Sequence, residues 1–344
     1  MKFLTTGIGS VPHSSIDAAI EFALRFDVPF VPQVPILNPR ERMVHQALSG
    51  FPGIHAPSSD REDGSVEIDL SLDEETLRTL KSHLSRAFTQ SANQSAFEFF
   101  LPKQEDYRCL RPLLWEASER GKNQVKLQLA GPWTSLKSLR PSTPEQGAVF
   151  PPQIKALLFE FILARALSLL RVTAQSGAKP LLFIDEPYLF ALQPKTHPLD
   201  QVVLKELQFF FEALRKEARS CGGEIGMHCC SDPDWTEVLT HLPIDHLSVD
   251  ASVSFHSLTG VHQAAMTDFL NRGGKIIWGV VPSNLEQSDI EIPVSVLEKG
   301  RNAKSGMITP ACGLAYHTPL ECEDVLTRLH AAQARLNSLF LHSV

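Results

Sequence analysis

The stretch LLFIDEP at positions 181–187 carries the pattern that decides the fold. It begins with apolar residues only, ends on the acids Asp185 and Glu186, and is stopped by Pro187. A run that is apolar on both faces is typical of a parallel strand covered by helices. Two acids at its end indicate a pocket. Because adjacent strand residues face opposite sides, only one acid would enter the pocket and the other would cap or orient.

Similar β-rich runs recur along the chain, with helical patterns between them. Apolar residues at helical spacing follow the candidate helix caps Ser14 and Ser15, and a second amphipathic stripe follows Pro319. Eight strands alternating with helices predict an α/β fold, a single (β/α)8 TIM barrel spanning residues 1–344. The eight expected strands lie at 3–9, 28–33, 125–131, 181–187, 223–230, 245–251, 275–281 and 306–312.

The regular spacing fails between the second and third expected strands, where residues 34–124 intervene. This segment contains a turn-rich stretch at 50–65, a short alternating run at 66–70 and a helical pattern at 73–88. We expect an insertion that forms a subdomain or a lid over one end of the barrel.

Composition and charge limit the classes of partner. The 344 residues are 43% hydrophobic and 21% charged with a net charge of -7, which predicts an ordinary globular protein without the basic surface of a nucleic-acid-binding protein. The N-terminus lacks the pattern of an export signal, and Glu160 and Arg165 interrupt the most apolar run. We therefore expect a cytoplasmic protein with no membrane span and a small-molecule ligand.

Three potential metal ligands stand side by side in GMHCCSD, at positions 226–232. Residues two apart in a strand point the same way, so His228 and Cys230 can converge while Cys229 faces the surrounding helices. An imidazole with a thiolate suits Zn²⁺. Further ligands are expected from the carboxyl ends of other strands, where Asp250 and Cys312 lie.

Two other interpretations of these cysteines stay open. Free cysteines are often small buried hydrophobes, and the six in this chain are too few for a disulfide scaffold. A redox pair of Cys229 with Cys230 is disfavoured, because neighbouring cysteines form a strained disulfide. We expect the remaining cysteines to be packing residues: Cys109, Cys221 and Cys322.

The first expected strand ends in TGIGSVP, at positions 6–12. This is not a dinucleotide-binding fingerprint, because the glycine that would complete it is missing. The amides beside Gly9 and the hydroxyl of Ser10 could instead hold a small carboxylate.

Taken in chain order, seven stretches resemble the catalytic barrel of cobalamin-independent methionine synthase, within a grouping that includes uroporphyrinogen decarboxylase and corrinoid-dependent methyltransferases. The stretches are TGIGSVP, LAGPWTS, LFIDEPYL, GMHCCSDPDW, LSVDAS, WGVVPSN and ITPACGL. The resemblance implies a zinc ion held by His228, Cys230 and Cys312, with Asp250 where the family has a glutamate. It implies that homocysteine contacts Ile8, Gly9, Ser10 and Asp185.

Departures from the family pattern bear on the methyl donor. Full-length members carry a second barrel, and their folate donor is served by a histidine that WGVVPSNLEQ lacks. An acid that contacts the amino group of homocysteine after strand two also has no counterpart, and Gln33 is the nearest polar residue. The chain is therefore similar to the short, single-barrel methionine synthases, which are thought to take the methyl group from a methylated corrinoid protein.

Three hypotheses follow. The first is a zinc-dependent methyltransferase that converts homocysteine to methionine, with Asp185 or Ser10 holding the amino acid end and Glu186 and Gln33 as further contacts. The second is a metal-free decarboxylase like uroporphyrinogen decarboxylase, which is disfavoured because TGIGSVPHSS has no arginine. The third is a zinc–thiol subunit that works only when docked to a corrinoid protein through residues 34–124.

Overall fold

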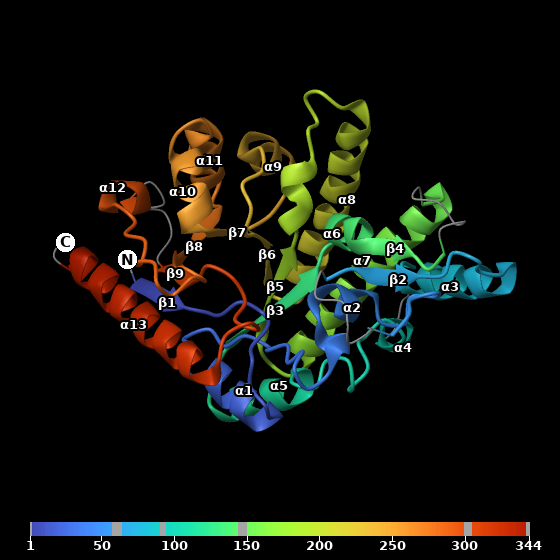
Figure 1. The fold of residues 1–344 in the computed structure, drawn as a ribbon, viewed down its shortest axis with the longest axis horizontal. Helices are drawn as coiled ribbons and strands as arrows, with labels where there is room; N and C mark the ends of the chain where they lie inside the picture. Colours follow the sequence, from blue (N-terminus) through green and yellow to red (C-terminus); the bar gives the residue numbers. More distant parts are fainter. Residues whose placement is uncertain (1, 57–63, 90–93, 144–149, 299–304, 342–344) are drawn as a thin grey trace.

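A computed structural model of the chain describes residues 2–56, 64–89, 94–143, 150–298 and 305–341 (Figure 1). Its centre is a curled parallel sheet that forms a half-barrel, with the strand order β1-β9-β8-β7-β6-β5-β3. The strands are β1 Lys2–Thr5, β3 Gln124–Ala130, β5 Lys179–Asp185, β6 Glu224–Cys229, β7 His246–Asp250, β8 Lys275–Val281 and β9 Ser305–Pro310.

Seven of the eight expected strands therefore lie in this sheet, but the second one does not form regular strand structure. Residues 28–33 make only isolated bridges, from Phe30 to Lys126 and from Gln33 to Ser10. The physical reason is in the sequence, because Pro29 and Pro32 have no N–H to donate to a ladder. The eight-stranded barrel is thus not confirmed.

The irregular segment nevertheless lies between the two edges of the sheet. On one side, the N–H of Val28 donates to the carbonyl of Thr5 at 3.0 Å. On the other side, the N–H of Val31 donates to the carbonyl of Lys126 at 2.9 Å. Val28 is also buried inside the curl, with Phe183 among its neighbours. Residues 28–33 thus contact both β1 and β3 without completing a ladder with either.

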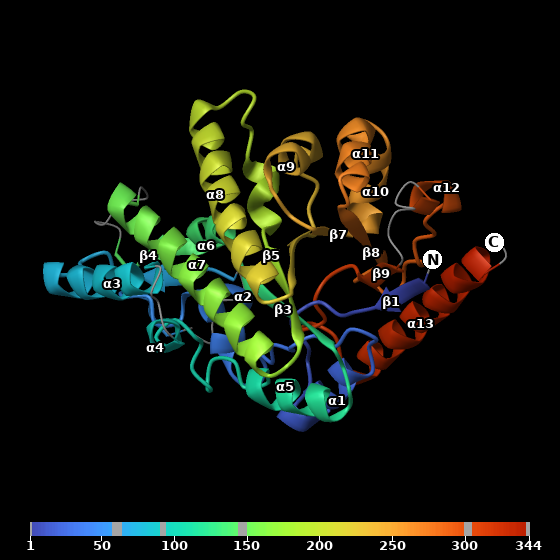
Figure 2. The same cartoon turned by 180° about the vertical axis from the view of Figure 1, so that it is seen from behind.

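Helices cover the outer face of the sheet (Figures 1 and 2). The long helix α13 packs on β1, β8 and β9, while α7 contacts β5 and α8 contacts β6. The helices are α1 Ile16–Leu24, α2 Met43–Leu48, α3 Glu74–Ala87, α4 Gln94–Glu98, α5 Leu110–Glu119, α6 Pro132–Ser138, α7 Pro152–Gln175, α8 Pro198–Ser220, α9 Trp235–His241, α10 Ala251–Thr259, α11 Gln263–Asn271, α12 Val294–Leu297 and α13 Pro319–Leu341, with the 3-10 turns η1 Pro39–Glu41 and η3 Pro187–Ala191.

Local signals explain where several helices begin. Ser15 caps α1 as expected, since its side chain accepts a hydrogen bond from the N–H of Ala18 at 3.2 Å. Asp73 caps α3 in the same way, accepting from the N–H of Thr76 at 2.6 Å.

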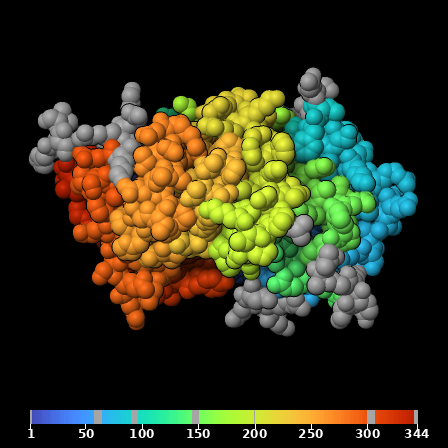
Figure 3. Space-filling model, turned by 90° about the horizontal axis from the view of Figure 1, so that it is seen from above, coloured from blue at the N-terminus to red at the C-terminus, as the bar shows by residue number. Residues whose placement is uncertain are grey.

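From above, the sequence colours pass from cyan through green and yellow to orange and red, as consecutive strand–helix units lie side by side (Figure 3).

The segment 34–124 contains its own short elements. The strand β2 (Val66–Ile68) forms where the alternating run at 66–70 was expected, and α3 covers the expected helix at 73–88. β2 pairs in parallel with β4 (Leu139–Pro141) outside the main sheet, and α3 and α4 pack against α7. A role for this segment as a subdomain or lid stays a prediction.

In the part of the chain that the structure describes, no helix combines the length and the apolar character needed to cross a membrane.

Candidate metal centre

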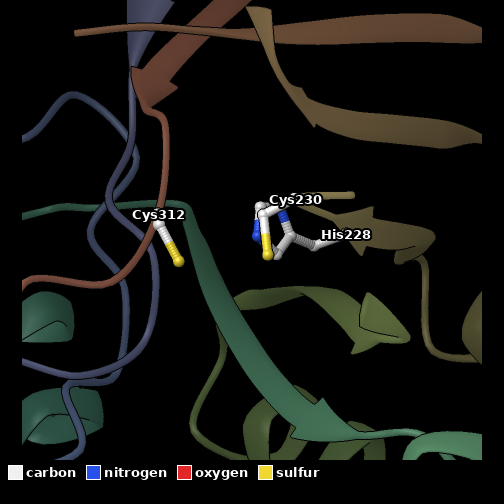
Figure 4. Close-up of side chains that lie close together, drawn as sticks. All are labelled: His228, Cys230 and Cys312. Carbon is white, nitrogen blue, oxygen red and sulfur yellow. The ribbon is translucent and has the colours of Figure 1, made fainter. Parts of the chain in front are cut away.

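Three side chains that lie far apart in the sequence come together at the carboxyl ends of two strands. His228 lies near the end of β6, Cys230 follows that strand, and Cys312 follows β9. One potential ligand atom from each lies within 4.8 Å of the others (Figure 4). A ring nitrogen and two sulfurs at this separation could hold one metal ion.

The imidazole of His228 is oriented for such a role. The side chain is buried, and its Nδ1 lies 3.1 Å from the Oγ of Ser248 on the neighbouring strand β7. Its Nε2 is also buried and has no hydrogen-bond partner among the described residues. A buried polar atom without a partner lowers the stability of the fold, and a bound metal ion would give this nitrogen a partner. With two thiols beside it, this donor set fits Zn²⁺.

The two thiols are electrostatically coupled. The pKa of Cys312 is held well below its usual value, because the side chains of Cys230 and then His228 beside its sulfur favour the thiolate. The same contact with Cys312, together with burial, raises the pKa of Cys230. One thiolate therefore forms readily in this group, and a cation would favour the second.

Cys229 faces away from the group, as strand alternation predicts. It is fully buried, and its sulfur lies 3.1 Å from the Oγ of Ser231. Burial raises the pKa of its thiol to about 12, so this cysteine is a neutral packing residue at ordinary pH.

The structure gives Asp250, the expected fourth ligand, another partner. It ends β7 and caps α10, where its Oδ1 accepts hydrogen bonds from the N–H of Ser252 at 2.8 Å and from the hydroxyl of the same residue at 2.6 Å. Asp250 lies outside the group of His228, Cys230 and Cys312. Its assignment as a metal ligand stays a prediction.

The two acids at the end of the fourth expected strand have different surroundings: Asp185 is the last residue of β5, and Glu186 follows it. Asp185 is buried beside the metal group, paired in register with His228, and both its oxygens lie 3.0 Å from the Nε2 of Gln128. Burial raises its pKa, while the charges of His228 and Lys126 oppose that rise. Asp185 is thus the acid that lies beside the metal group.

Glu186 points to the other side and caps α6, and its contact with a substrate stays a prediction. Its carboxylate accepts hydrogen bonds from the N–H of Trp133 at 3.0 Å, and from the N–H and hydroxyl of Thr134 at 2.7 and 2.6 Å. Burial raises the pKa of Glu186 to about 7 despite these donors. The hydrogen bonds show a structural role for this acid.

The turn at residues 8–10 lies against the segment that carries Cys312. Gly9 has a φ of 34°, in the left-handed region that favours glycine, and Ile8 is buried. The carbonyl of Ser10 accepts from the N–H of Leu314 at 2.7 Å, and a Cβ on Gly313 would come within 2.7 Å of the Ser10 Oγ. The turn and the metal group are therefore adjacent.

Gln33 lies beside the same turn. It is buried, and a Cβ on Gly9 would lie 2.9 Å from its Oε1. Its Nε2 donates to the Oε1 of Gln46 on α2 at 2.6 Å. Gln33 therefore joins the turn at residues 8–10 to α2. Its contact with a substrate stays a prediction.

Three further polar residues at the site were not predicted from the sequence: Lys126, Gln128 and Ser248. All three are buried, and each is a polar residue inside a strand with apolar neighbours. In QVKLQLA the polar residues stand two apart and so share one face of β3. That alternation is the signal that could have found Lys126 and Gln128.

No family model matches the sequence, and none of the curated proteins matches it. Solved structures do match. A methyltransferase from Methanosarcina mazei is 13% identical with a TM-score of 0.57, over 98% of this chain and 94% of that chain. A B12-independent methionine synthase from Shewanella sp. W3-18-1, in complex with selenomethionine, is 15% identical with a TM-score of 0.44, over 67% of each chain.

At these identities the likeness to the Methanosarcina mazei methyltransferase shows a shared fold, along nearly the whole chain. The fold and the site together define an α/β protein with a curled parallel sheet and a histidine–cysteine–cysteine group at its carboxyl edge.

Proposed function

We propose that this protein is a zinc-dependent methyltransferase that alkylates a small thiol, with homocysteine as the acceptor and methionine as the product. The observation that carries the proposal is the convergence of His228, Cys230 and Cys312, with ligand atoms within 4.8 Å of one another. The resemblance of the motifs to cobalamin-independent methionine synthase and the fold shared with a methyltransferase support it.

His228, Cys230 and Cys312 would hold the zinc, with Asp250 or solvent as a fourth ligand. When bound, zinc favours the thiolate form of a thiol substrate at neutral pH and so supplies a nucleophile. In the transfer, the substrate sulfur forms a bond to the methyl carbon while the bond from that carbon to its donor breaks. The donor keeps that electron pair, and the thiol proton is lost to solvent.

The residues around the metal group would bind the amino acid end of the substrate. The Asp185 carboxylate would accept a hydrogen bond from the α-ammonium group, and the turn at Gly9 and Ser10, which is adjacent to Cys312, would lie near the α-carboxylate. Ile8 would pack against the apolar part of the substrate. An opposite charge in a buried site gives both affinity and orientation, which positions the sulfur toward the metal group.

We further propose that the donor is a methylcorrinoid, free or on a corrinoid protein, instead of a methylfolate. The support is the sequence WGVVPSNLEQ, which begins in β8 and continues beyond it, and which lacks the histidine that the folate-dependent family uses. A cytoplasmic location and a corrinoid partner stay predictions of the sequence.

Purified protein tests the proposal through its metal content and activity. We expect about one zinc per chain, and methionine formed from homocysteine and methylcobalamin. The Cys230→Ser/Cys312→Ser variant should lose both, whereas Cys221→Ser, at the end of α8, should keep both.

The methyl donor is tested separately. Activity with methylfolate alone would refute the donor assignment. Activity only after cell extract is added would favour a subunit that needs a corrinoid partner. Full metal retention in the double variant would refute the zinc site itself.

A further inference from the structure

We propose that Lys126 is a positioning residue that, through Gln128, fixes the carboxylate of Asp185 and thereby sets the preference of the site for a thiol that carries an amino group. The substrate part of this inference rests on the proposed function. The positioning part rests only on the contacts of Lys126, Gln128 and Asp185.

Lys126 is a charged residue that is almost completely buried. Its side chain lies inside the curl of the sheet, on the inner face of β3, with an exposed fraction of only 1%. A lysine taken out of water is costly unless its ammonium is paired and hydrogen-bonded. An apolar residue of the same length would fill this position at less cost to folding, so the charge points to a role beyond packing.

The contacts of the ammonium group are specific. Its Nζ donates to the carbonyl oxygen of Gly7 at 2.8 Å and to the Oε1 of Gln128 at 2.5 Å. It also lies 4.8 Å from the centre of the Phe183 ring, a cation–π contact. Lys126 therefore ties the strand that carries Gln128 to the start of the turn at Gly7.

Two donors define which way the amide of Gln128 faces. Its Oε1 accepts from Lys126 and also from the N–H of Gly9, at 2.5 Å. An amide oxygen that is held by two donors leaves the NH₂ group pointing the other way. That NH₂ group lies 3.0 Å from each oxygen of Asp185.

These contacts form a buried hydrogen-bonded network that runs from the ammonium group of Lys126 through the amide of Gln128 to the carboxylate of Asp185. If Lys126 is lost, only the N–H of Gly9 still holds the amide oxygen, so the amide can shift within its site and the contacts of its NH₂ group with the two oxygens of Asp185 change. The carboxylate would then lose its orientation toward the α-ammonium group of a substrate. The thiol and its metal ligands would be unaffected.

The test compares wild type with Lys126→Met, which keeps the length of the side chain and removes the charge. Lys179→Met, at the exposed start of β5, is the matched control. Two thiols are used as acceptors: homocysteine, and 4-mercaptobutyrate, which lacks the amino group. We expect the preference for homocysteine in kcat/KM to fall about 10- to 100-fold in Lys126→Met, mostly through KM, with zinc content unchanged.

A second variant separates positioning from a general loss of structure. Gln128→Glu still accepts from Lys126 and Gly9, but it places a second carboxyl group beside Asp185, and the two groups repel or share one proton. This variant should therefore lower the same preference. The Lys126→Met/Gln128→Glu variant should then lose little more of this preference than either single variant does, because both changes act on the same hydrogen-bonded network. Equal losses for both thiols, or no loss for either, would overturn the proposal.

Crystal structures of wild type and Lys126→Met make the outcome independent of the proposed reaction. If wild-type protein binds and methylates neither thiol, the proposed function fails, yet a displaced Asp185 carboxylate in Lys126→Met would still support the positioning role. Unchanged positions of Gln128 and Asp185 in that variant would overturn it.

Discussion

His228 and Ser248 are register partners on the neighbouring strands β6 and β7, and the Oγ of Ser248 lies 3.1 Å from the Nδ1 of His228. This contact leaves the buried Nε2 on the side of the metal group. A hydroxyl that holds one ring nitrogen of a metal-binding histidine fixes the orientation of the ring. The serine thus supports the site although it offers no ligand in the proposed set.

The first prediction concerns this serine. Ser248→Ala removes the partner of Nδ1, so zinc affinity should fall about 10- to 100-fold, as measured by competition with a chromogenic chelator. The fold should persist, because the change removes a single atom. Ser168→Ala, which alters a buried serine on α7 far from the metal group, should leave the affinity unchanged. Equal affinities for wild type and Ser248→Ala would argue against the orientation of His228 described above.

A second prediction separates the neighbouring cysteines. Because Cys230 belongs to the metal group and Cys229 points toward Ser231, Cys230→Ala should lose most of its zinc while Cys229→Ala keeps about one per chain. The cost of Cys229→Ala should appear as a lower melting temperature, since a buried side chain is shortened. Elemental analysis of the two variants decides, and the reverse result would contradict the assignment of the ligands.

A third prediction concerns Gly9. An alanine there would have to adopt a φ of 34° and would bring its Cβ within 2.9 Å of the Gln33 Oε1. We expect Gly9→Ala to lower the free energy of unfolding by about 1–3 kcal/mol and to raise the KM for homocysteine at unchanged zinc content.

Gly121→Ala is the control for this change. Gly121 also has a positive φ, but a Cβ there would meet nothing within 4 Å. It should show the cost of the backbone conformation without any effect on KM. An unchanged KM in Gly9→Ala would remove the turn from the substrate site.

A fourth prediction concerns acid stability at the opposite end of the strands. Glu224 accepts from the buried His246 and from Lys275, both at 2.9 Å, and these contacts lower its pKa to about 2, with the His246 hydrogen bond as the largest cause. A depressed carboxyl pKa stabilises the fold above the unfolded value of about 4.3, and this stability is lost as the pH falls toward 2.

Because 39% of the Glu224 side chain is exposed, screening reduces the expected gain to about 1 kcal/mol. Urea unfolding of wild type and Glu224→Gln at several pH values measures it. The difference between the two proteins should be fully present above about pH 5 and vanish near pH 2. Methyl transfer should not change at pH 7, because Glu224 begins β6 and the metal group lies at the other end. A constant difference across pH would contradict the pKa assigned to Glu224.

The sequence predicted most of the sheet, because strands covered by helices are nearly continuous in apolar residues. It did not distinguish residues 28–33 from the others, since their apolar composition is the same. The difference lies in Pro29 and Pro32, which withhold two backbone donors and leave only isolated bridges. Their effect on hydrogen bonding outweighs the hydrophobic pattern.

For the site, spacing within one strand was a reliable guide and residue type alone was not. Alternation along β6 correctly separated Cys229 from its neighbours. Asp250 directly precedes α10 and caps it, whereas Glu186 caps α6, which lies earlier in the chain. A carboxylate in either position can cap backbone N–H groups as well as bind a ligand. Sequence does not choose between those roles, because the choice depends on which face of the strand each acid occupies.

X-ray absorption at the zinc edge, before and after addition of homocysteine, tests the central claim most directly. We expect zinc with two sulfur ligands from Cys230 and Cys312 in the free protein, and a third sulfur after homocysteine is added. 4-Mercaptobutyrate at saturating concentration should give the same change. Protein without zinc, or a sulfur count that stays the same with saturating homocysteine, would contradict the proposal that this site binds and activates a thiol.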